Sequence, residues 1–333
     1  MQGQVRWVRL GWQGVALEVP EDWCPGSIEG DYANGYLRVE DETHVRLELR
    51  WETAARGVPA ASRLVDAYLK QSLRKLPRGS PEPAIDRDRT IKELAAVDHE
   101  AFTWRGAPRQ VQGAPGAPRG GYNAHSLLLV VPEARRAVHL RVFFDAADDM
   151  KALARRLFGS VRVAAGDAPL EWAVFGLRFL LPAAWRLEQS ALRTGVLKFV
   201  FRAGNDELEV MRQSLAGITL KGTSLEAWLL AQFAKALRGF RWSSRSESYR
   251  GHGAARCGGP LSLRARPLAL FRRRRYASAL AWHCPQADKL FALRCESFQA
   301  DDPRLAACAD SIACCAGAES PGNPGEDEEE GRG

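Results

Sequence analysis

The chain has 333 residues, of which 46% are apolar and ten are tryptophan, and its formal net charge is +7. Such a length suits two domains better than one, and the apolar content excludes a wholly disordered chain. No apolar run reaches the ~20 residues of a membrane-spanning helix, and the N-terminus lacks the basic start and apolar middle of a signal peptide. We therefore expect a cytoplasmic protein without a membrane span.

The charge is unevenly distributed along the chain. The tail from Glu319 onward contains six acidic residues and one arginine, so the rest of the chain carries a net charge of +12. A basic body with an acidic tail can indicate an anionic partner, or a tail that shields the body. The tail is rich in Gly, Pro, Ser and acidic residues, and we expect residues 317–333 to be disordered.

The first half of the chain begins with an apolar strand, residues 15–19, which ends at Pro20 and is followed by Trp23. Residues 26–35 are polar and glycine-marked, which predicts a loop. Residues 44–51 alternate strictly between apolar and polar, which is typical of a half-buried antiparallel strand. Further on we predict a helix over 60–76, charged loops over 80–92 and 106–121, a hairpin over 126–144 and a short helix before residue 160.

The second half repeats this order. Residues 177–185 again form an apolar run that ends in Pro182-x-x-Trp185, and a helix is predicted over 224–237 with a capping box from Thr223 to Glu226. A hairpin around Pro285 and a last helix that starts at Asp302-Pro303 follow. We predict one repeat over residues 1–165 and a second over 170–316, in an α+β fold with two tandem α/β/α sandwich domains, each an antiparallel sheet covered by helices.

Both repeats have an apolar strand that ends in Pro-x-x-Trp, a turn glycine, and a closing helix that runs into a serine: Pro20-x-x-Trp23 and Pro182-x-x-Trp185, Gly35 and Gly195, Ser160 and Ser311. In these features each repeat resembles the PsbP-like family, whose fold also includes Ran-binding nuclear-import factors and bacterial secretion-linked chaperones. The resemblance implies a sandwich around an antiparallel sheet and a binding role, because members are mostly adaptors. The chain lacks a lumenal targeting segment, and no partner-binding residue of the family can be matched to it.

Candidate catalytic and metal-binding residues are weakly marked. His99 and His252 are placed at matching positions of the two repeats, without a Ser, Cys or carboxylate beside both, so we interpret them as hydrogen-bonded structural residues. Six of the seven cysteines lie between residues 257 and 315, but they lack the close Cys-x2–4-Cys pairs of zinc sites. We therefore expect buried, reduced thiols and predict no catalytic residue, no metal site and no cofactor.

The arginines before the second hairpin form the sharpest charge feature, and we name them as candidate binding residues: Arg264, Arg266, Arg272, Arg273, Arg274 and Arg275. Such a loop can bind phosphate-rich ligands or nucleic acid, or can be covered by the acidic tail. Leucines interleave with these arginines, which indicates that part of the loop is packed.

The sequence thus favours a non-enzymatic tandem binding protein, an adaptor or chaperone-like scaffold whose partner is another protein. The alternative is an anionic-ligand or nucleic-acid binder that uses the arginine-rich loops. An enzyme built on His252 and a nearby thiol is the third possibility, although no phosphate loop, dinucleotide fingerprint or nucleophile elbow is present.

Overall fold

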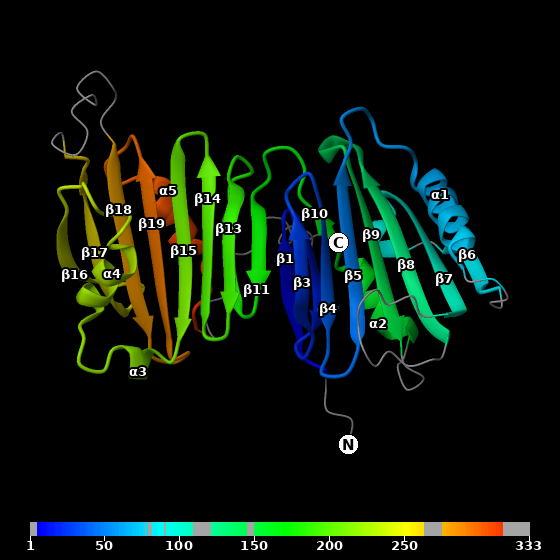
Figure 1. Cartoon of the computed structure of the whole chain (residues 1–333), viewed down its shortest axis with the longest axis horizontal. Helices are drawn as coiled ribbons and strands as arrows, with labels where there is room; N and C mark the ends of the chain where they lie inside the picture. Colours follow the sequence, from blue (N-terminus) through cyan, green and yellow to red (C-terminus); the bar gives the residue numbers. More distant parts are fainter. Residues whose placement is uncertain are drawn as a thin grey trace, which may run out of the picture. The chain divides into compact units, whose positions relative to one another are not determined.

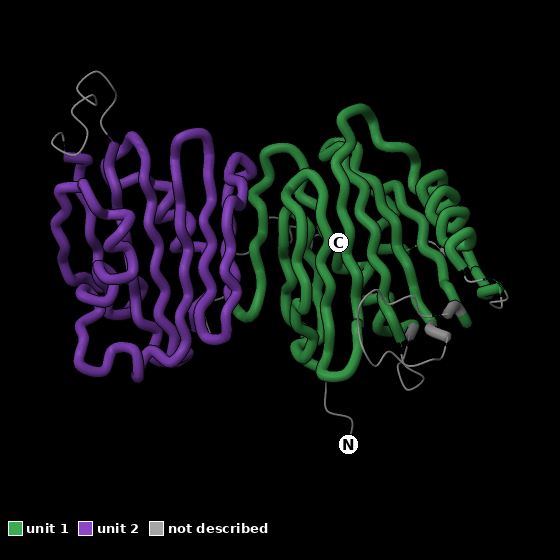
Figure 2. Tube along the Cα trace, in the orientation of Figure 1, with its two compact units in different colours: residues 1–176 green, residues 177–333 purple. Residues whose placement is uncertain are grey.

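The computed structural model describes residues 5–76, 78, 82–89, 91–108, 121–144, 150–262 and 275–315. The chain divides into two compact units, residues 1–176 and 177–333 (Figure 2). Strands contain 51% of the described residues and helices 19%. The protein is therefore β-rich, and the predicted α+β class with two helix-covered α/β/α sandwiches is wrong.

The first unit is built on a seven-stranded antiparallel sheet. Its order is β3 (Cys24–Gly30), β4 (Asn34–Glu40), β5 (Val45–Thr53), β9 (Arg136–Phe144), β8 (Gly121–Val131), β7 (Asp98–Pro108) and β6 (Ala84–Arg89). Four further strands are hydrogen-bonded in the order β10 (Arg162–Val163), β2 (Val15–Pro20), β1 (Trp7–Trp12) and β11 (Leu170–Val174). The helices are α1 (Ala61–Arg74), α2 (Met150–Gly159) and two short 3₁₀ turns, η1 (Lys92–Leu94) and η2 (Pro132–Ala134).

The second unit contains a sheet of the same topology (Figure 1). Its order is β13 (Arg186–Arg193), β14 (Val196–Ala203), β15 (Asp206–Ser214), β19 (Lys289–Ser297), β18 (Tyr276–Cys284), β17 (His252–Pro260) and β16 (Ser243–Tyr249). The unit also contains β12 (Leu177–Leu181), α3 (Ala216–Thr219), α4 (Leu225–Phe233) and α5 (Pro303–Ser311). The helix α4 contacts β16, β17 and β18, while α5 contacts β12 and β19.

In the core beneath α4, large side chains of the helix pack against small side chains of the sheet. Trp228, Leu229 and Phe233 of the helix pack on an alanine-rich surface of β17 and β18. The small side chains of Ala279 and Ala281 leave room for the large side chains of the helix, and all of them are buried in one cluster. In the first unit the packing is reversed, because α1 offers Ala61, Val65 and Leu69 to a surface that contains the larger Phe102, Trp104 and Leu128.

Local details recur in both units. The amide of Trp23 donates to the carbonyl of Pro20 at 3.0 Å, and that of Trp185 donates to Pro182 at 3.0 Å. Both indoles are buried, so each proline ends a strand and each tryptophan closes the end of a core.

A serine at the end of the closing helix makes the same bridge in each unit. Ser160 Oγ accepts from the amide of Glu18 at 2.8 Å, and Ser311 Oγ accepts from the amide of Leu180 at 2.9 Å. Each hydroxyl also donates to the carbonyl three residues before it. The helix end is thereby tied to the strand that the proline ends, β2 or β12.

The fold class was mispredicted because edge strands carry a weak signal. The range 26–35, expected to be a loop, lies mostly in β3 and β4, and the range 80–92, also expected to be a loop, includes β6. Strands β3 and β16 contain no fully buried residue, so apolar residues do not recur at alternate positions in them. Each sheet thus becomes wider than one short helix can cover.

Other predicted elements fare better. The strands over 15–19 and 44–51, the helix over 60–76 and the hairpin over 126–144 are confirmed within a few residues. The helix predicted over 224–237 ends at Phe233, and its N-cap is Ser224, whose side chain accepts from the Ala227 amide, rather than Thr223. Most of the loop predicted over 106–121 and the tail 317–333 lie outside the described residues. None of the helices that the structure describes has the length and apolarity needed to cross a bilayer.

Candidate functional site

Four side chains with metal-binding atoms converge in the second unit. His252 begins β17, Cys284 ends β18, and Cys314 and Cys315 follow α5. The imidazole and the three sulfurs supply one ligand atom each, and these four atoms all lie within 4.8 Å of one another. We call this group the Cys3His cluster.

The distances within the cluster are short. His252 Nε2 lies 3.4 Å from Cys314 Sγ and 3.3 Å from Cys315 Sγ. Cys315 Sγ lies 3.4 Å from Cys314 Sγ and 3.7 Å from Cys284 Sγ. These sulfurs are far beyond the ~2.05 Å of a disulfide bond, and all three cysteines are free.

Local backbone geometry explains how these donors are presented. Arg250 and Gly251 have φ values of 50° and 76°, so the β16–β17 hairpin turns through two left-handed residues and β17 begins directly at His252. Cys284 is the last residue of β18 before the turn at Pro285. Its strand position opposite Lys289 places its side chain on the same face as Trp282, two residues earlier.

The segment after α5 is held beside these strands. Arg250 Nη1 donates to the carbonyl of Ile312 at 2.8 Å, and thereby satisfies one of the carbonyls at the end of the helix. Cys284 Sγ donates to the carbonyl of Cys314 at 3.3 Å. Both contacts bring Cys314 and Cys315 to the end of β18.

Three thiols and one imidazole form a set of soft ligands. Such a set can hold a zinc ion or another thiophilic metal, whereas calcium and magnesium prefer oxygen. Without a metal, burial and the hydrogen bonds with Cys314 and Cys284 raise the pKa of Cys315 to about 12. Cys257 and Cys295 lie outside the cluster and are inert core thiols. Burial raises the pKa of Cys257 to about 11 and that of Cys295 to about 12.

The strand registers correct the predicted match between the two histidines. His99 pairs with Leu129 in the first sheet. In the second sheet Trp282 is at the position that corresponds to Leu129, and it pairs with Ala254 rather than with His252. His252 therefore lies two residues away from the position equivalent to His99. The two side chains also differ in surroundings, because His99 Nε2 accepts from the Ile91 amide at 3.0 Å and its Nδ1 lies 2.8 Å from the Val97 carbonyl, as a structural histidine would.

Apolar residues occupy the positions of the first unit that correspond to the cluster. Extending both registers places Val97 at the position of His252, and Val131, the last residue of β8, at that of Cys284. Val163 and Ala164 are the third and fourth residues after Ser160, and they correspond to Cys314 and Cys315, the third and fourth residues after Ser311. The four counterparts of the cluster in the first unit are therefore Val97, Val131, Val163 and Ala164. The cluster is thus a property of the second unit within the described chain.

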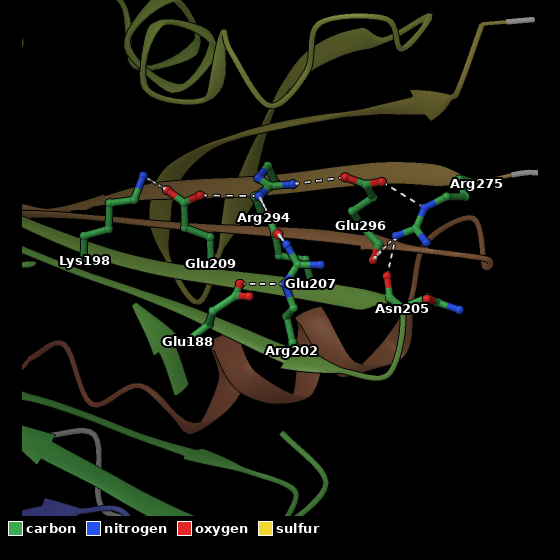
Figure 3. Close-up of polar contacts among 9 residues, drawn as sticks. All are labelled: Glu188, Lys198, Arg202, Asn205, Glu207, Glu209, Arg275, Arg294 and Glu296. Atoms are coloured by element: carbon green, nitrogen blue, oxygen red, sulfur yellow. Dashed lines mark hydrogen bonds and ion pairs between the residues drawn. The ribbon is translucent and has the colours of Figure 1, made fainter. Parts of the chain in front are cut away.

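The candidate arginines are only partly visible. Arg264, Arg266, Arg272, Arg273 and Arg274 lie outside the described residues. Arg275 begins the described hairpin and is not a free cation. Its Nε donates to Glu296 at 2.8 Å, and its Nη2 donates to the carbonyl of Asn205 at 2.7 Å (Figure 3). Its guanidinium also lies 5.0 Å from the ring centroid of Phe298.

Arg275 belongs to a ladder of alternating charges across β13, β14, β15 and β19 (Figure 3). At its centre the Arg294 guanidinium, 2% exposed, contacts three carboxylates: Glu207, Glu209 and Glu296. Three further ion pairs continue the ladder towards the edge of the sheet: Lys198–Glu209, Arg202–Glu207 and Arg202–Glu188. Each described arginine of the ladder is therefore compensated by carboxylates.

The central pair of this ladder recurs in the first unit. Glu209 lies directly opposite Arg294, and Glu48 lies directly opposite Arg141 at the equivalent register. The nitrogen–oxygen distances are 3.4 Å in the second unit and 3.5 Å in the first. A Glu–Arg pair at the middle of the sheet is thus part of the repeated framework.

Two comparisons with known sequences found no match. No protein-family model matches the sequence, and no curated protein is significantly similar to it. The resemblance to the PsbP-like family stays a prediction.

The Cys3His cluster was missed in the sequence because its members come from three places in the fold. Their spacing contains no close Cys-x2–4-Cys pair, which is the usual signal of a zinc site. A weaker signal was present in the strand ends. His252 follows a turn glycine, Cys284 precedes a turn proline, and two adjacent cysteines follow the last helix.

Proposed function

We propose that this protein is a non-enzymatic tandem binding protein, an adaptor or chaperone-like scaffold for another protein. The observation that carries the proposal is what the two units have in common. Their shared residues are framework residues: the Pro–Trp turns, the bridging serines Ser160 and Ser311, and the central Glu–Arg pairs. The histidine–thiol cluster has apolar counterparts in the first unit, so among the described residues this cluster is not repeated with the framework.

The ladder side of the second sheet is the surface we assign to binding. The Arg294 guanidinium lies 6.0 Å from the ring centroid of Phe233, so α4 and the ladder share one face of the sheet. The helix contacts β16, β17 and β18, and the ladder residues on β13, β14 and β15 lie beyond those contacts. Glu188, Lys198 and Arg202 are 42%, 42% and 49% exposed, and each is paired with an opposite charge. Fixed alternating charges on a sheet suit recognition of a complementary protein surface better than enclosure of a small substrate.

The alternative, an anionic-ligand or nucleic-acid binder, receives less support from the described residues. Its described member, Arg275, is paired with Glu296 and packed on Phe298. Location in the cytoplasm and a protein partner remain parts of the proposal. An enzyme based on His252 also receives less support, because its ring nitrogen faces two thiols rather than one positioned nucleophile.

The test is partner capture that depends on the ladder. The intact chain is cross-linked in native lysate, and stoichiometric partners are identified by mass spectrometry. Arg202→Glu should reduce recovery of the partner at least tenfold, because it reverses the charge of an exposed ladder residue. The matched control is Arg245→Glu, a 71% exposed residue on β16 whose neighbour Ser244 bonds α4, so that Arg245 faces the opposite side of the sheet.

Three outcomes would overturn the proposal. Equal recovery with both variants would show that the ladder is not the binding surface. Turnover of a metabolite by the pure chain, without a stoichiometric protein partner, would establish an enzyme. A salt-sensitive shift with generic DNA or RNA that Arg202→Glu leaves unchanged would instead favour the arginine-rich loop.

A further inference from the structure

We propose that the Cys3His cluster of the second unit binds one zinc ion, with His252 Nε2 and the Sγ atoms of Cys284, Cys314 and Cys315 as its four ligands. The proposal is independent of the binding role proposed above. It is based on the distances among the four atoms, the chemistry of the ligands, the apolar counterparts in the first unit and the conformation of the chain after α5.

The distances agree with a tetrahedron around zinc. Bond lengths of about 2.3 Å to sulfur and about 2.0 Å to nitrogen place two sulfurs about 3.8 Å apart and a sulfur and nitrogen about 3.5 Å apart. The observed sulfur–sulfur distances are 3.7 Å for Cys284–Cys315 and 3.4 Å for Cys314–Cys315. The distances from His252 Nε2 to the sulfurs of Cys314 and Cys315 are 3.4 and 3.3 Å. The remaining two pairs, Cys284 Sγ with Cys314 Sγ and with His252 Nε2, lie within 4.8 Å, so small side-chain adjustments complete the site.

The ligand set selects the metal. Three thiolates and one imidazole in tetrahedral arrangement are typical of zinc, whereas an iron–sulfur cluster with cysteine ligands alone needs four of them. Binding releases the three thiol protons to solvent, because thiolate is the ligand form, and leaves His252 neutral with its proton on Nδ1. All four positions of the zinc ion are then filled by the protein, which is the arrangement of a structural site.

The first unit shows what the metal does for the second. After α2, the residues Arg162 and Val163 form β10, which pairs with Ala16 and Val15 of β2. After α5, the described residues 312–315 form no strand. We infer that zinc replaces the missing strand pairing and holds this segment at the ends of β17 and β18. The first unit has apolar residues at Val97, Val131, Val163 and Ala164, which is consistent with this difference, because pairing of β10 with β2 already holds its corresponding segment.

Burial of the cluster supports a retained ion rather than an exchanging one. Cys284 and Cys314 are buried, while His252 and Cys315 are partly exposed. Tyr249 and Trp282 pack nearby with ring centroids 5.0 Å apart, and Trp282 stacks on Phe291 at 5.1 Å. Apolar surroundings of this kind limit the access of water and chelators to the ligands.

The experiment measures metal in the full chain. The protein is purified under reducing conditions without a chelator, and its zinc content is determined by inductively coupled plasma mass spectrometry. We expect one zinc per chain. X-ray absorption at the zinc edge should show three sulfurs at about 2.3 Å and one nitrogen at about 2.0 Å. Replacement of zinc by cobalt(II) should give the intense visible bands of a tetrahedral thiolate complex.

The matched variant gives the second unit the residues of the first. It combines His252→Val, Cys284→Val, Cys314→Val and Cys315→Ala, and it should lose the zinc completely. The control Cys24→Ser changes an exposed cysteine outside the cluster and should keep one zinc per chain.

Several results would overturn the assignment. Folded wild-type protein that binds no zinc after reconstitution would do so, as would a fourfold variant that keeps the metal. Oxygen ligands in the absorption spectrum, or a disulfide between Cys284 and Cys315 in freshly reduced and repurified protein, would also refute it. The spectra of the wild-type protein decide the question if the fourfold variant does not fold.

Discussion

Replacing Arg294 with methionine tests whether the charge ladder holds the second sheet together. The guanidinium is 2% exposed, and Glu209 beside it is 6% exposed, so the pair is desolvated. Breaking such a pair by removing one partner typically costs about 3 to 5 kcal/mol, because a buried charge loses its compensation. Glu209 keeps Lys198, and Glu207 keeps Arg202, so we expect a loss of about 3 kcal/mol in the free energy of unfolding.

The matched control is Arg202→Met in the same ladder. Arg202 is 49% exposed, and its partner Glu188 is 42% exposed, so solvent screens the pair. Removal of an exposed partner typically costs about 0 to 1 kcal/mol. Arg294→Met should therefore destabilise the second unit by at least three times as much as Arg202→Met.

Urea unfolding combined with hydrogen exchange measures both changes. Exchange of the β15 and β19 amides, followed by mass spectrometry, assigns the loss to the second unit, and the β5 and β9 amides report on the first.

A double variant separates charge from packing. Arg294→Met with Glu209→Gln should be more stable than Arg294→Met alone, because it removes a buried carboxylate that has lost its arginine partner and keeps only Lys198. Two results would refute the reasoning. One is an equal loss for Arg294→Met and Arg202→Met, and the other is a double variant whose loss is the sum of the two single losses.

The remaining predictions concern a histidine, the two bridging serines, the zinc and the binding surface. Burial, with a smaller contribution from Arg50, lowers the pKa of His139 to about 4, so the unfolded chain binds more protons between that value and about 6.5. The neutral imidazole's contribution to stability is complete above about pH 6.5 and is lost as the pH falls, by about 2 kcal/mol at pH 5. His139→Phe should therefore make the urea unfolding midpoint depend less on pH between about 6.5 and 5, and an unchanged pH dependence would contradict the prediction. Ser160→Ala and Ser311→Ala each orphan one strand amide and should each cost about 1 to 2 kcal/mol in urea unfolding, whereas clearly unequal costs would show that the two bridges are not equivalent. The zinc content of the fourfold variant and the partner recovery with Arg202→Glu complete the set.

Chain order and local chemistry made much of the fold predictable. Pro20 and Pro182 end strands because proline lacks an amide proton, and the tryptophan three residues later closes the core in each unit. The strict alternation over 44–51 identified β5, because one side of that strand is buried. The edge strands β3 and β16 were not predictable in the same way, since a strand without a fully buried residue has no apolar period.

The candidate site was less predictable than the fold. The arginines from 264 to 275 form a run that the sequence displays directly, yet Arg275 is neutralised by Glu296, which lies on the neighbouring strand. The Cys3His cluster has the opposite character. Its members are separated in the chain, and a ligand set is recognisable in the sequence only when its members are close together.

The repeated order of elements and the residues that end them follow from local sequence, because strand ends, helix caps and buried alternation depend on near neighbours in the chain. Tertiary structure alone decided the width of each sheet, the register that separates His99 from His252, and the meeting of His252, Cys284, Cys314 and Cys315. The physical reason is that pairing between distant strands brings side chains within ångströms of one another without leaving any regular spacing between them in the chain.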